Sequence, residues 1–442
     1  MKIKQLTLAT FIALTSFNSI VSADNLLNIY ETAQLQDPVI QKSKAQYDMY
    51  LEKVSTSNAA LLPQIGFGLN AAQTKDKDDI NSNTQYGANL SLSQSIYNSS
   101  YWKELDLAEL QATQYAAIYG YAQQNLILRT SSIYFDVLRA NQSVISVSAN
   151  KLAVARQLEQ TKQRFDVGLI AITDVHEAQA EYDRTNADLI KAKNKLMNSF
   201  YALRELTGAE INKIDLLNTL TFSASPVEGK IQLWQHKALE NNLLLHEKRI
   251  VKDLAQMQIK LAQTGHQPTL DLSASIGYNN TSYDNVATRS DIEMSNVSVG
   301  LEFNLPIYTG GKTSSLVKQA KYTYVMASED LVQSYRSINA SIKSGYNNVR
   351  ASISSILAYE QTVISSKSAL EATKAGFEVG TRTIVDVLDA TRKLFESEDL
   401  LANARYDYIL SQLQLKNSAG TLSIQDIKDI SSGLIASTTP NT

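Results

Sequence analysis

The stretch that decides the fold is Phe165-Asp-Val-Gly-Leu-Ile-Ala-Ile-Thr-Asp-Val-His-Glu-Ala178, which returns later in the chain as Phe377-Glu-Val-Gly-Thr-Arg-Thr-Ile-Val-Asp-Val-Leu-Asp-Ala390. The two copies align without a gap and share the Phe-x-Val-Gly start, the Ile-x-Asp-Val centre and the final alanine. The pairs Ile96-Tyr97 and Ile307-Tyr308 recur at nearly the same spacing. The chain is therefore a tandem duplication of units of roughly 200 residues, which predicts a ring in which each chain supplies two similar wedges.

The first residues have the features of a secretory signal peptide. Lys2 and Lys4 make the start basic, and the apolar run Leu6–Leu14 is too short to span a bilayer. Because a small-x-small pattern ends at Ala23, we expect residues 1–23 to be removed on export. The sequence contains no cysteine, which favours a bacterial envelope protein held together by packing. Its net charge of −3 becomes more negative once two lysines are lost, and this argues against a nucleic-acid partner.

Two segments, at about 64–96 and 269–307, alternate apolar and polar residues with a period of two and are predicted to be β-hairpins. Alternation over about ten residues is typical of a transmembrane barrel strand, whose apolar side chains face lipid. A half-buried strand of a soluble sheet has the same pattern, so alternation alone leaves both readings open. The apolar positions are Ile65, Phe67, Leu69, Ala88, Leu90, Leu92, Leu270, Leu272, Ala274, Ile276, Tyr278, Val297, Val299, Leu301, Phe303, Leu305 and Ile307.

Two hairpins supply too few strands to close a barrel, and lipid does not tolerate an open sheet edge. If these strands lie in a membrane, several chains must complete one barrel together. Two chains would supply about eight strands and three chains about twelve. The strand count thus predicts an oligomer without choosing between these sizes.

The rest of each repeat is mainly helical. The segments Tyr101–Phe165 and Lys312–Gly376 lack proline, and each would form a helix about 100 Å long, roughly three times the thickness of a hydrocarbon core. Because two shorter helices together match one long helix, we expect them to stack end to end beside it. Residues 208–230 and 420–442 would then form a belt partway along. The shorter helices are predicted at Leu26–Leu61, Asp174–Leu206, Ile231–Gln263 and Asp386–Asn417.

The helix after the second Val-Gly turn has two apolar seams with steps of three and four residues. One seam starts at Ile384 and Val387, and the other starts at Val385 and Leu388. A two-stranded coiled coil needs only one seam, so two seams indicate a neighbour on each side, as in the wall of a helical barrel. An ordinary helical bundle is the alternative. The resulting division of the mature chain is 24–225 for the first repeat, 226–424 for the second and 425–442 for a C-terminal tail in the belt.

The sequence around both Val-Gly turns resembles the TolC family of outer-membrane export channels. The resemblance rests on Val379–Thr391, Leu401–Tyr406 and Arg164–Val175, and it extends over essentially the whole mature chain. It implies an α+β membrane protein with an internal two-fold repeat, in which a homotrimer forms a 12-stranded transmembrane β-barrel. A long α-helical barrel would continue this β-barrel from the outer membrane of a Gram-negative bacterium into the periplasm. The resemblance therefore selects three chains over two.

The same resemblance implies a passive exit duct for drugs, small toxic compounds and proteins. Its partners would be further copies of the chain, outer-membrane lipid, a periplasmic adaptor (a membrane fusion protein) and an inner-membrane pump of the RND, ABC or MFS type. One alternative is an exit channel dedicated to type I protein secretion. Another, from a different class, is a periplasmic helical scaffold or adaptor without a pore. Two hairpins with lipid-type alternation favour a channel.

The sequence offers little support for an enzyme. Gly310-Gly-Lys-Thr resembles the end of a phosphate-binding loop, but the glycine that such a loop requires is replaced by Pro306. The segment is therefore expected to be a turn from hairpin to helix. The spacing of the four histidines is not that of metal ligands: they are His176, His236, His246 and His266. We expect no catalytic residue, no cofactor and no protein-bound metal.

Asp386 and Asp389 are the candidate pore constriction. They are three residues apart and so lie on one face of a helix. Acids at a helix start are also favoured by the macrodipole, and Thr383 and Asp386 have the spacing of a capping box. In a trimer the two acids would place six carboxylates around one axis, where such rings select cations and bind multivalent ones. The corresponding residues of the family form a constriction, which favours the pore interpretation.

The family's closed gate relies on links between neighbouring helices near the same tip. Its pattern maps onto Thr173, Asp174 and Arg382, and the Arg382 guanidinium can donate to Thr173 and to nearby carboxylates. The family's tyrosine partner of the Asp174 position is Phe377 here and lacks the hydroxyl. The sequence therefore predicts a gate that depends more on Arg382 and less on the link that the tyrosine makes in the family.

Gly168 and Gly380 occupy equivalent places in the two Val-Gly turns. A glycine there permits a left-handed turn or close approach of another backbone. The structural interpretation is that each glycine caps the end of a helix. The resemblance implies in addition that the two turns receive the helical tips of the adaptor.

Overall fold

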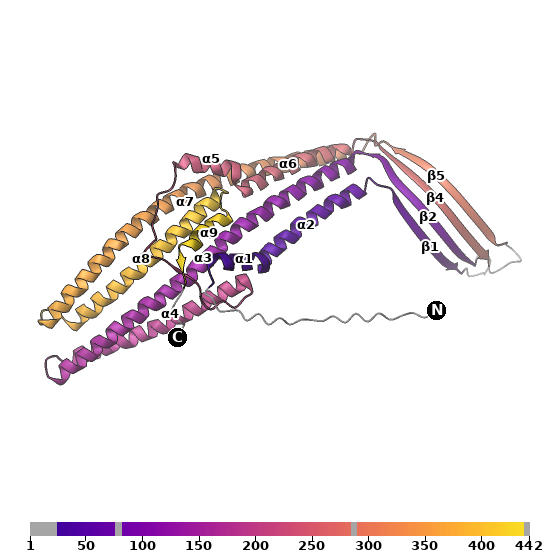
Figure 1. Ribbon diagram of the computed structural model, residues 1–442. Helices are drawn as coiled ribbons and strands as arrows, with labels where there is room; N and C mark the ends of the chain where they lie inside the picture. Colours follow the sequence, from indigo (N-terminus) through magenta and orange to yellow (C-terminus); the bar gives the residue numbers. More distant parts are fainter. Residues whose placement is uncertain (1–23, 76–81, 284–289, 437–442) are drawn as a thin grey trace.

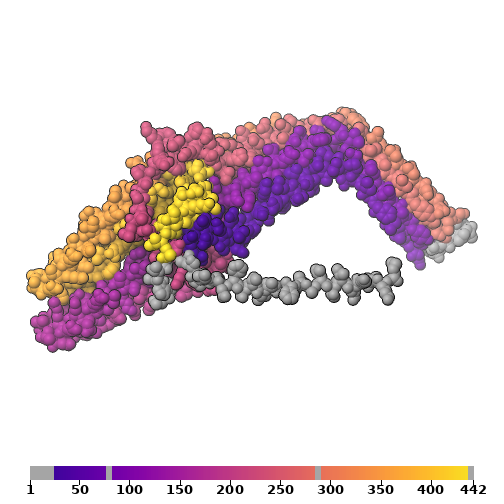
Figure 2. All heavy atoms as spheres, in the orientation of Figure 1, coloured from indigo at the N-terminus to yellow at the C-terminus, as the bar shows by residue number. Residues whose placement is uncertain are grey.

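The computed structural model describes residues 24–75, 82–283 and 290–436. The predicted signal peptide 1–23 lies outside these ranges. The molecule is long and bent (Figures 1 and 2), with a curved sheet at one end and two helical hairpins extending toward the other. The arrangement gives each chain the shape of a strip of wall rather than of a closed body.

The sheet contains the two predicted hairpins side by side. Its order is β1 (Gln64–Thr74), β2 (Asn83–Asn98), β4 (Thr269–Tyr283) and β5 (Ile292–Asn304), and all neighbours are antiparallel. The pairing of β2 with β4 joins the two repeats in the middle of the sheet and leaves β1 and β5 as its edges. β5 ends before the expected limit at 307 because Pro306 cannot donate a ladder hydrogen bond.

The apolar residues of the edge strands are exposed in the single chain. In β1, Phe67 is 68 % exposed and Leu69 is 74 % exposed, and in β5 the values for Val297 and Val299 are both 74 %. An apolar surface of this extent marks an interaction site for protein or membrane. The alternation in the sequence therefore corresponds to an apolar stripe on one face of the sheet.

The two long helices run from the sheet to the far end (Figure 1). α3 (Ser99–Asp166) begins after Asn98, whose side-chain oxygen accepts a hydrogen bond from the Ser100 N–H at 3.1 Å. α7 (Lys312–Glu378) begins after Gly311, which has a φ of 81°. The Gly310-Gly-Lys-Thr segment is thus the turn from hairpin to helix that the sequence predicted.

The prediction of one unbroken helix at the start of each repeat is wrong. The first is divided into α1 (Leu26–Gln36) and α2 (Pro38–Ala59), because Pro38 restricts the residue before it and Asp37 caps α2 through the Ile40 N–H at 3.2 Å. The second is divided at Asn242 into α5 (Ile231–Asn241) and α6 (Leu243–Thr264). There the Asn242 side chain alone supplies the cap, accepting from the Leu245 N–H at 2.9 Å.

Shorter helices lie along each long one, as expected. α2 packs on the half of α3 nearer the sheet and α4 (Ile172–Thr207) on the other half, while α6 and α8 (Ile384–Ser418) cover α7 in the same way. The Asn242 Nδ2 donates to the Ser418 carbonyl oxygen at 2.8 Å and so joins the end of α8 to the start of α6. α3 also packs against α6 and α8, which makes one continuous wall of helices.

A belt crosses the wall partway along (Figure 1). It contains α9 (Ile424–Ser432) and a small sheet of β3 (Leu216–Leu217) with β6 (Leu434–Ile435). The largest buried cluster lies here and includes Tyr134 and Phe135. In the described ranges, none of the helices has both the length and the apolar character required to cross a membrane.

Candidate functional site

The two hairpin turns far from the sheet are here called the tips: residues 167–171 between α3 and α4, and 379–383 between α7 and α8 (Figure 1). Gly168 and Gly380 both have a φ of 78°, a left-handed conformation that disfavours any side chain. A Cβ at either position would meet nothing within 4 Å. The turns therefore need glycine for their own geometry and also leave open space around it.

A small apolar cluster holds the two tips of one chain together. It contains Val154 and Leu158 from α3, Ala178 from α4, and Ile384 and Leu388 from α8. These contacts explain why the α8 sequence carries apolar residues on more than one side. The cluster therefore joins the two hairpins of one chain close to the tips.

Phe377 packs on the edge of this cluster and accepts a cation on its ring. The Arg164 Cζ lies 4.7 Å from the ring centroid, which is the geometry of a cation–π contact. Arg164 lies in the last turn of α3 and Phe377 in the last turn of α7, so the contact joins the two hairpins. The sequence did not predict this contact, because the two residues come from different repeats.

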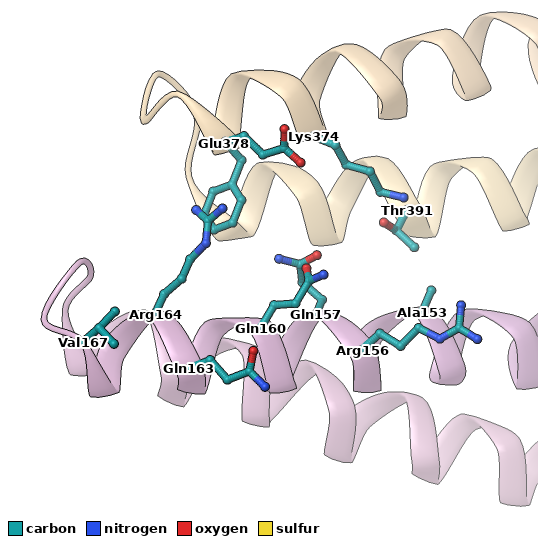
Figure 3. A pocket seen from close by; sticks show the side chains of 11 residues that line it. Ala153, Arg156, Gln157, Gln160, Gln163, Arg164, Val167, Lys374, Glu378 and Thr391 are labelled. Carbon is teal, nitrogen blue, oxygen red and sulfur yellow. The ribbon is translucent and has the colours of Figure 1, made fainter.

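A groove of about 560 Å³ separates the ends of α3 and α7 (Figure 3). Arg164 extends across it from α3 toward the end of α7. The groove has three basic side chains, Arg156, Arg164 and Lys374, against a single acid, Glu378. It is a polar, mainly basic surface beside the tips.

Asp386 caps the start of α8. Its Oδ2 accepts hydrogen bonds from the Thr383 N–H at 2.9 Å and from the Thr383 hydroxyl at 3.0 Å, and the Asp386 N–H donates to Thr383 Oγ1 at 3.3 Å. The predicted capping box is confirmed. These hydrogen bonds lower the pKa of Asp386, with a smaller contribution from the charge of Arg382. Asp386 therefore stays ionised and fixed in direction.

Asp389 has a different environment. Its Oδ2 lies 2.7 Å from the Lys393 Nζ, and its Oδ1 is paired with Arg392. The hydrogen bond from Lys393 and then that from Arg392 lower the pKa of Asp389. Sequence reasoning missed these pairs, although both partners lie at the three- and four-residue spacing that brings helical side chains together.

The predicted gate residues are not joined to one another within one chain. Thr173 and Asp174 begin α4, and Arg382 lies in the turn before α8. In the part of the chain that the structure describes, no hydrogen bond or ion pair connects Arg382 with either of them. Arg382 instead contributes its charge to the surroundings of Asp386. Over the same described residues, no group of side chains could hold a metal ion.

Residues 29–209 and 234–421 match the family model "Outer membrane efflux protein". The chain is 48 % identical to the outer membrane protein TolC of Vibrio cholerae over 98 % of both chains. It is 25 % identical to the alkaline protease secretion protein AprF of Pseudomonas aeruginosa over 94 % of this chain and 88 % of that one. The solved structure of the CmeC outer membrane channel of Campylobacter jejuni superposes with a TM-score of 0.77 at 16 % identity, covering 98 % of each chain.

The fold and the matches define one subunit of an outer-membrane channel with a helical barrel and a β domain. The chain belongs to the outer membrane efflux protein family, and the resemblance to TolC is confirmed. It is an outer-membrane efflux channel and not an enzyme. Because it is a channel, the alternative of a periplasmic scaffold without a pore is wrong. Channels of this family are trimers that work with adaptor and pump partners.

Proposed function

We propose that three chains form an exit duct for drugs and small toxic compounds, closed at rest at the tips and served by an adaptor and a pump of the RND, ABC or MFS type. The observation that supports it best is the pair of open edges, β1 and β5, on a sheet with an apolar outer stripe. Lipid requires such edges to be paired. Outer-membrane lipid would cover the stripe, and the helices would carry the duct into the periplasm.

The tips supply the proposed constriction. Asp386 is ionised, partly exposed and held in direction by its capping box, so three copies around the axis would attract cations. Asp389 would lie one turn further along the same helix. Arg382, Thr173 and Asp174 are proposed to link neighbouring chains, since no contact joins them within one chain. The contact between Arg164 and Phe377 would hold the two hairpins of each chain together in the closed state.

The tips also supply the proposed adaptor site. Gly168 and Gly380 have open space around them, and the neighbouring Val167 and Val379 are 70 % and 75 % exposed. Apolar side chains in so exposed a position are typical of a surface that binds a partner. The basic groove beside them offers charge to the same partner.

Export of proteins is a second candidate, because AprF, whose name refers to secretion of an alkaline protease, matches nearly the whole chain. A deletion strain separates the two cargo classes when sensitivity to several drugs and the amount of secreted protein are measured in parallel. A duct for small compounds predicts increased drug sensitivity that the intact gene restores. Unchanged drug sensitivity together with lost protein secretion would show a dedicated secretion channel instead.

A further inference from the structure

The second turn of α8 carries two cations beside the proposed constriction. Lys393 and Arg392 occupy the two carboxylate oxygens of Asp389, one each. Arg392 also reaches Glu396 at 3.4 Å. By contrast, the hydrogen-bond partners of the Asp386 carboxylate in the described chain are the uncharged N–H and hydroxyl of Thr383, and the charge of Arg382 acts on it without an ion pair. Two acids on the same face of α8 therefore have different electrostatic surroundings.

Arg392 also faces the neighbouring helix α4. Asp389 and Arg392 line a groove of about 390 Å³ between α8 and α4, opposite Glu181 and Arg184 of α4. Arg184 pairs with Glu181 and lies 3.6 Å from Asp188, so these two acids of α4 have a cation of their own. These two acids therefore do not compete with Asp389 for Arg392, which pairs with Asp389.

The exposure of these side chains determines whether the ion pairs affect the stability of the protein or the passage of ions. The side chain of Lys393 is 64 % exposed, and those of Arg392 and Asp389 are 38 % and 36 % exposed. Exposed ion pairs contribute little to stability. Their charges nevertheless act on ions in the adjacent water, and in a narrow pore the effect is repeated once for each chain. The pairs therefore matter for selectivity rather than for folding.

We propose that Arg392 and Lys393 determine the ion specificity of the constriction: they screen Asp389, so that Asp386 alone supplies the cation-binding ring. This inference rests on the proposed constriction at the tips. Beyond the Asp386 ring, each chain presents two cations against Asp389 and the more distant Glu396. The constriction is consequently less selective for cations than two acids per chain would indicate, and anionic solutes can pass the second turn.

The test uses the purified full-length channel in planar bilayers, with hexaamminecobalt(III) as a trivalent probe that does not exchange its ligands for carboxylates. Asp386→Asn is expected to remove most of the block, whereas Asp389→Asn should cause a clearly smaller loss. The double variant R392Q/K393Q should be blocked more easily. The concentration of hexaamminecobalt(III) that blocks half of the current should fall about tenfold, because six positive charges leave the mouth of the trimer. In that background Asp389→Asn should reverse most of the gain.

Lys191→Gln is the matched control, since Lys191 lies 3.6 Å from Asp188 in an exposed pair on α4. It should leave the block unchanged. If R392Q/K393Q forms no trimers, the single variant Lys393→Gln is measured in its place and should shift the block in the same direction. The proposal that Arg392 and Lys393 screen Asp389 is wrong if Asp386→Asn and Asp389→Asn weaken the block equally. It is also wrong if R392Q/K393Q is blocked like the original channel. If D386N/D389N keeps full cation preference and full block, the constriction itself is wrong.

Discussion

Hydrogen bonds from Thr383 both lower the pKa of Asp386 and fix the carboxylate at the start of α8. An acid whose folded pKa is lowered contributes its stability above the unfolded pKa, which is about 4, and loses it as the pH falls through the lower folded value. Cation preference should therefore be constant from about pH 7 to pH 5 and decline only at more acidic pH, where the Asp386 carboxylates of the ring become protonated. Reversal potentials measured over this range check the prediction, and a loss of preference between pH 7 and 5 would point to a different group.

The contact between Arg164 and Phe377 gives a second prediction at the scale of single residues. Arg164→Gln removes the cation and should raise the conductance of the resting channel, since a contact of about 1 kcal/mol in each chain is lost. Phe377→Leu should act in the same direction because the ring is lost. Phe377→Tyr keeps the aromatic face and should not raise the conductance. If all three variants conduct like the original channel in bilayers, the contact does not hold the tips closed.

Asp399 and Asp407 of α8 are expected to have opposite effects on stability. The Asp399 Oδ1 is buried without a partner in the described chain, and burial raises the pKa of this carboxyl. Asp399→Asn should stabilise the protein by about 1 kcal/mol, because a poorly solvated charge is removed. Asp407 lies 2.6 Å from Arg139, so Asp407→Asn should be neutral or destabilising. The temperature at which detergent-solubilised trimers dissociate measures both, and a less stable Asp399→Asn variant contradicts the argument.

At the scale of elements, the long helices and both hairpins could be predicted from sequence because their periods extend over many residues. The break between α1 and α2 can be recognised in the sequence from Pro38. The break at Asn242 depends on a single side-chain cap, and no proline marks it in the sequence. The capping box of Thr383 and Asp386 was predictable because it is local. The contact between Arg164 and Phe377 was not, since it needs two repeats to pack side by side.

The turns at the tips give a prediction about docking. Gly380→Val and Gly168→Val force a branched side chain into a left-handed turn and fill the open space beside it. Adaptor cross-linking should fall while trimers persist. Gly310→Val is the matched control, because Gly310 also has a positive φ, 61°, and open space but lies at the turn from β5 to α7. If Gly310→Val reduces cross-linking as much as the tip variants do, backbone strain and not docking explains the loss.

At the scale of the whole molecule, the sheet predicts how the chains join. The order β1-β2-β4-β5 leaves one edge on each side, and the helices repeat this pattern, with α2 and α4 at one side of the wall and α7 at the other. Closing a ring from identical strips requires β1 of one chain to pair with β5 of the next. The twelve strands of a trimer then form one barrel without a free edge.

Because the chain contains no cysteine, this pairing can be tested by disulfide cross-linking. Leu69→Cys in β1 is combined in turn with Val297→Cys, Val299→Cys or Leu301→Cys in β5, which samples three registers on the same outward face. At least one combination should give covalent trimers on oxidation, because Cβ atoms on directly paired strands lie about 4.5–5.5 Å apart. Leu69→Cys with Ile276→Cys is the control, since β2 separates β1 from β4. Failure of every register, or a stable channel-forming monomer by mass measurement in detergent, would show that the edges do not close the barrel in this way.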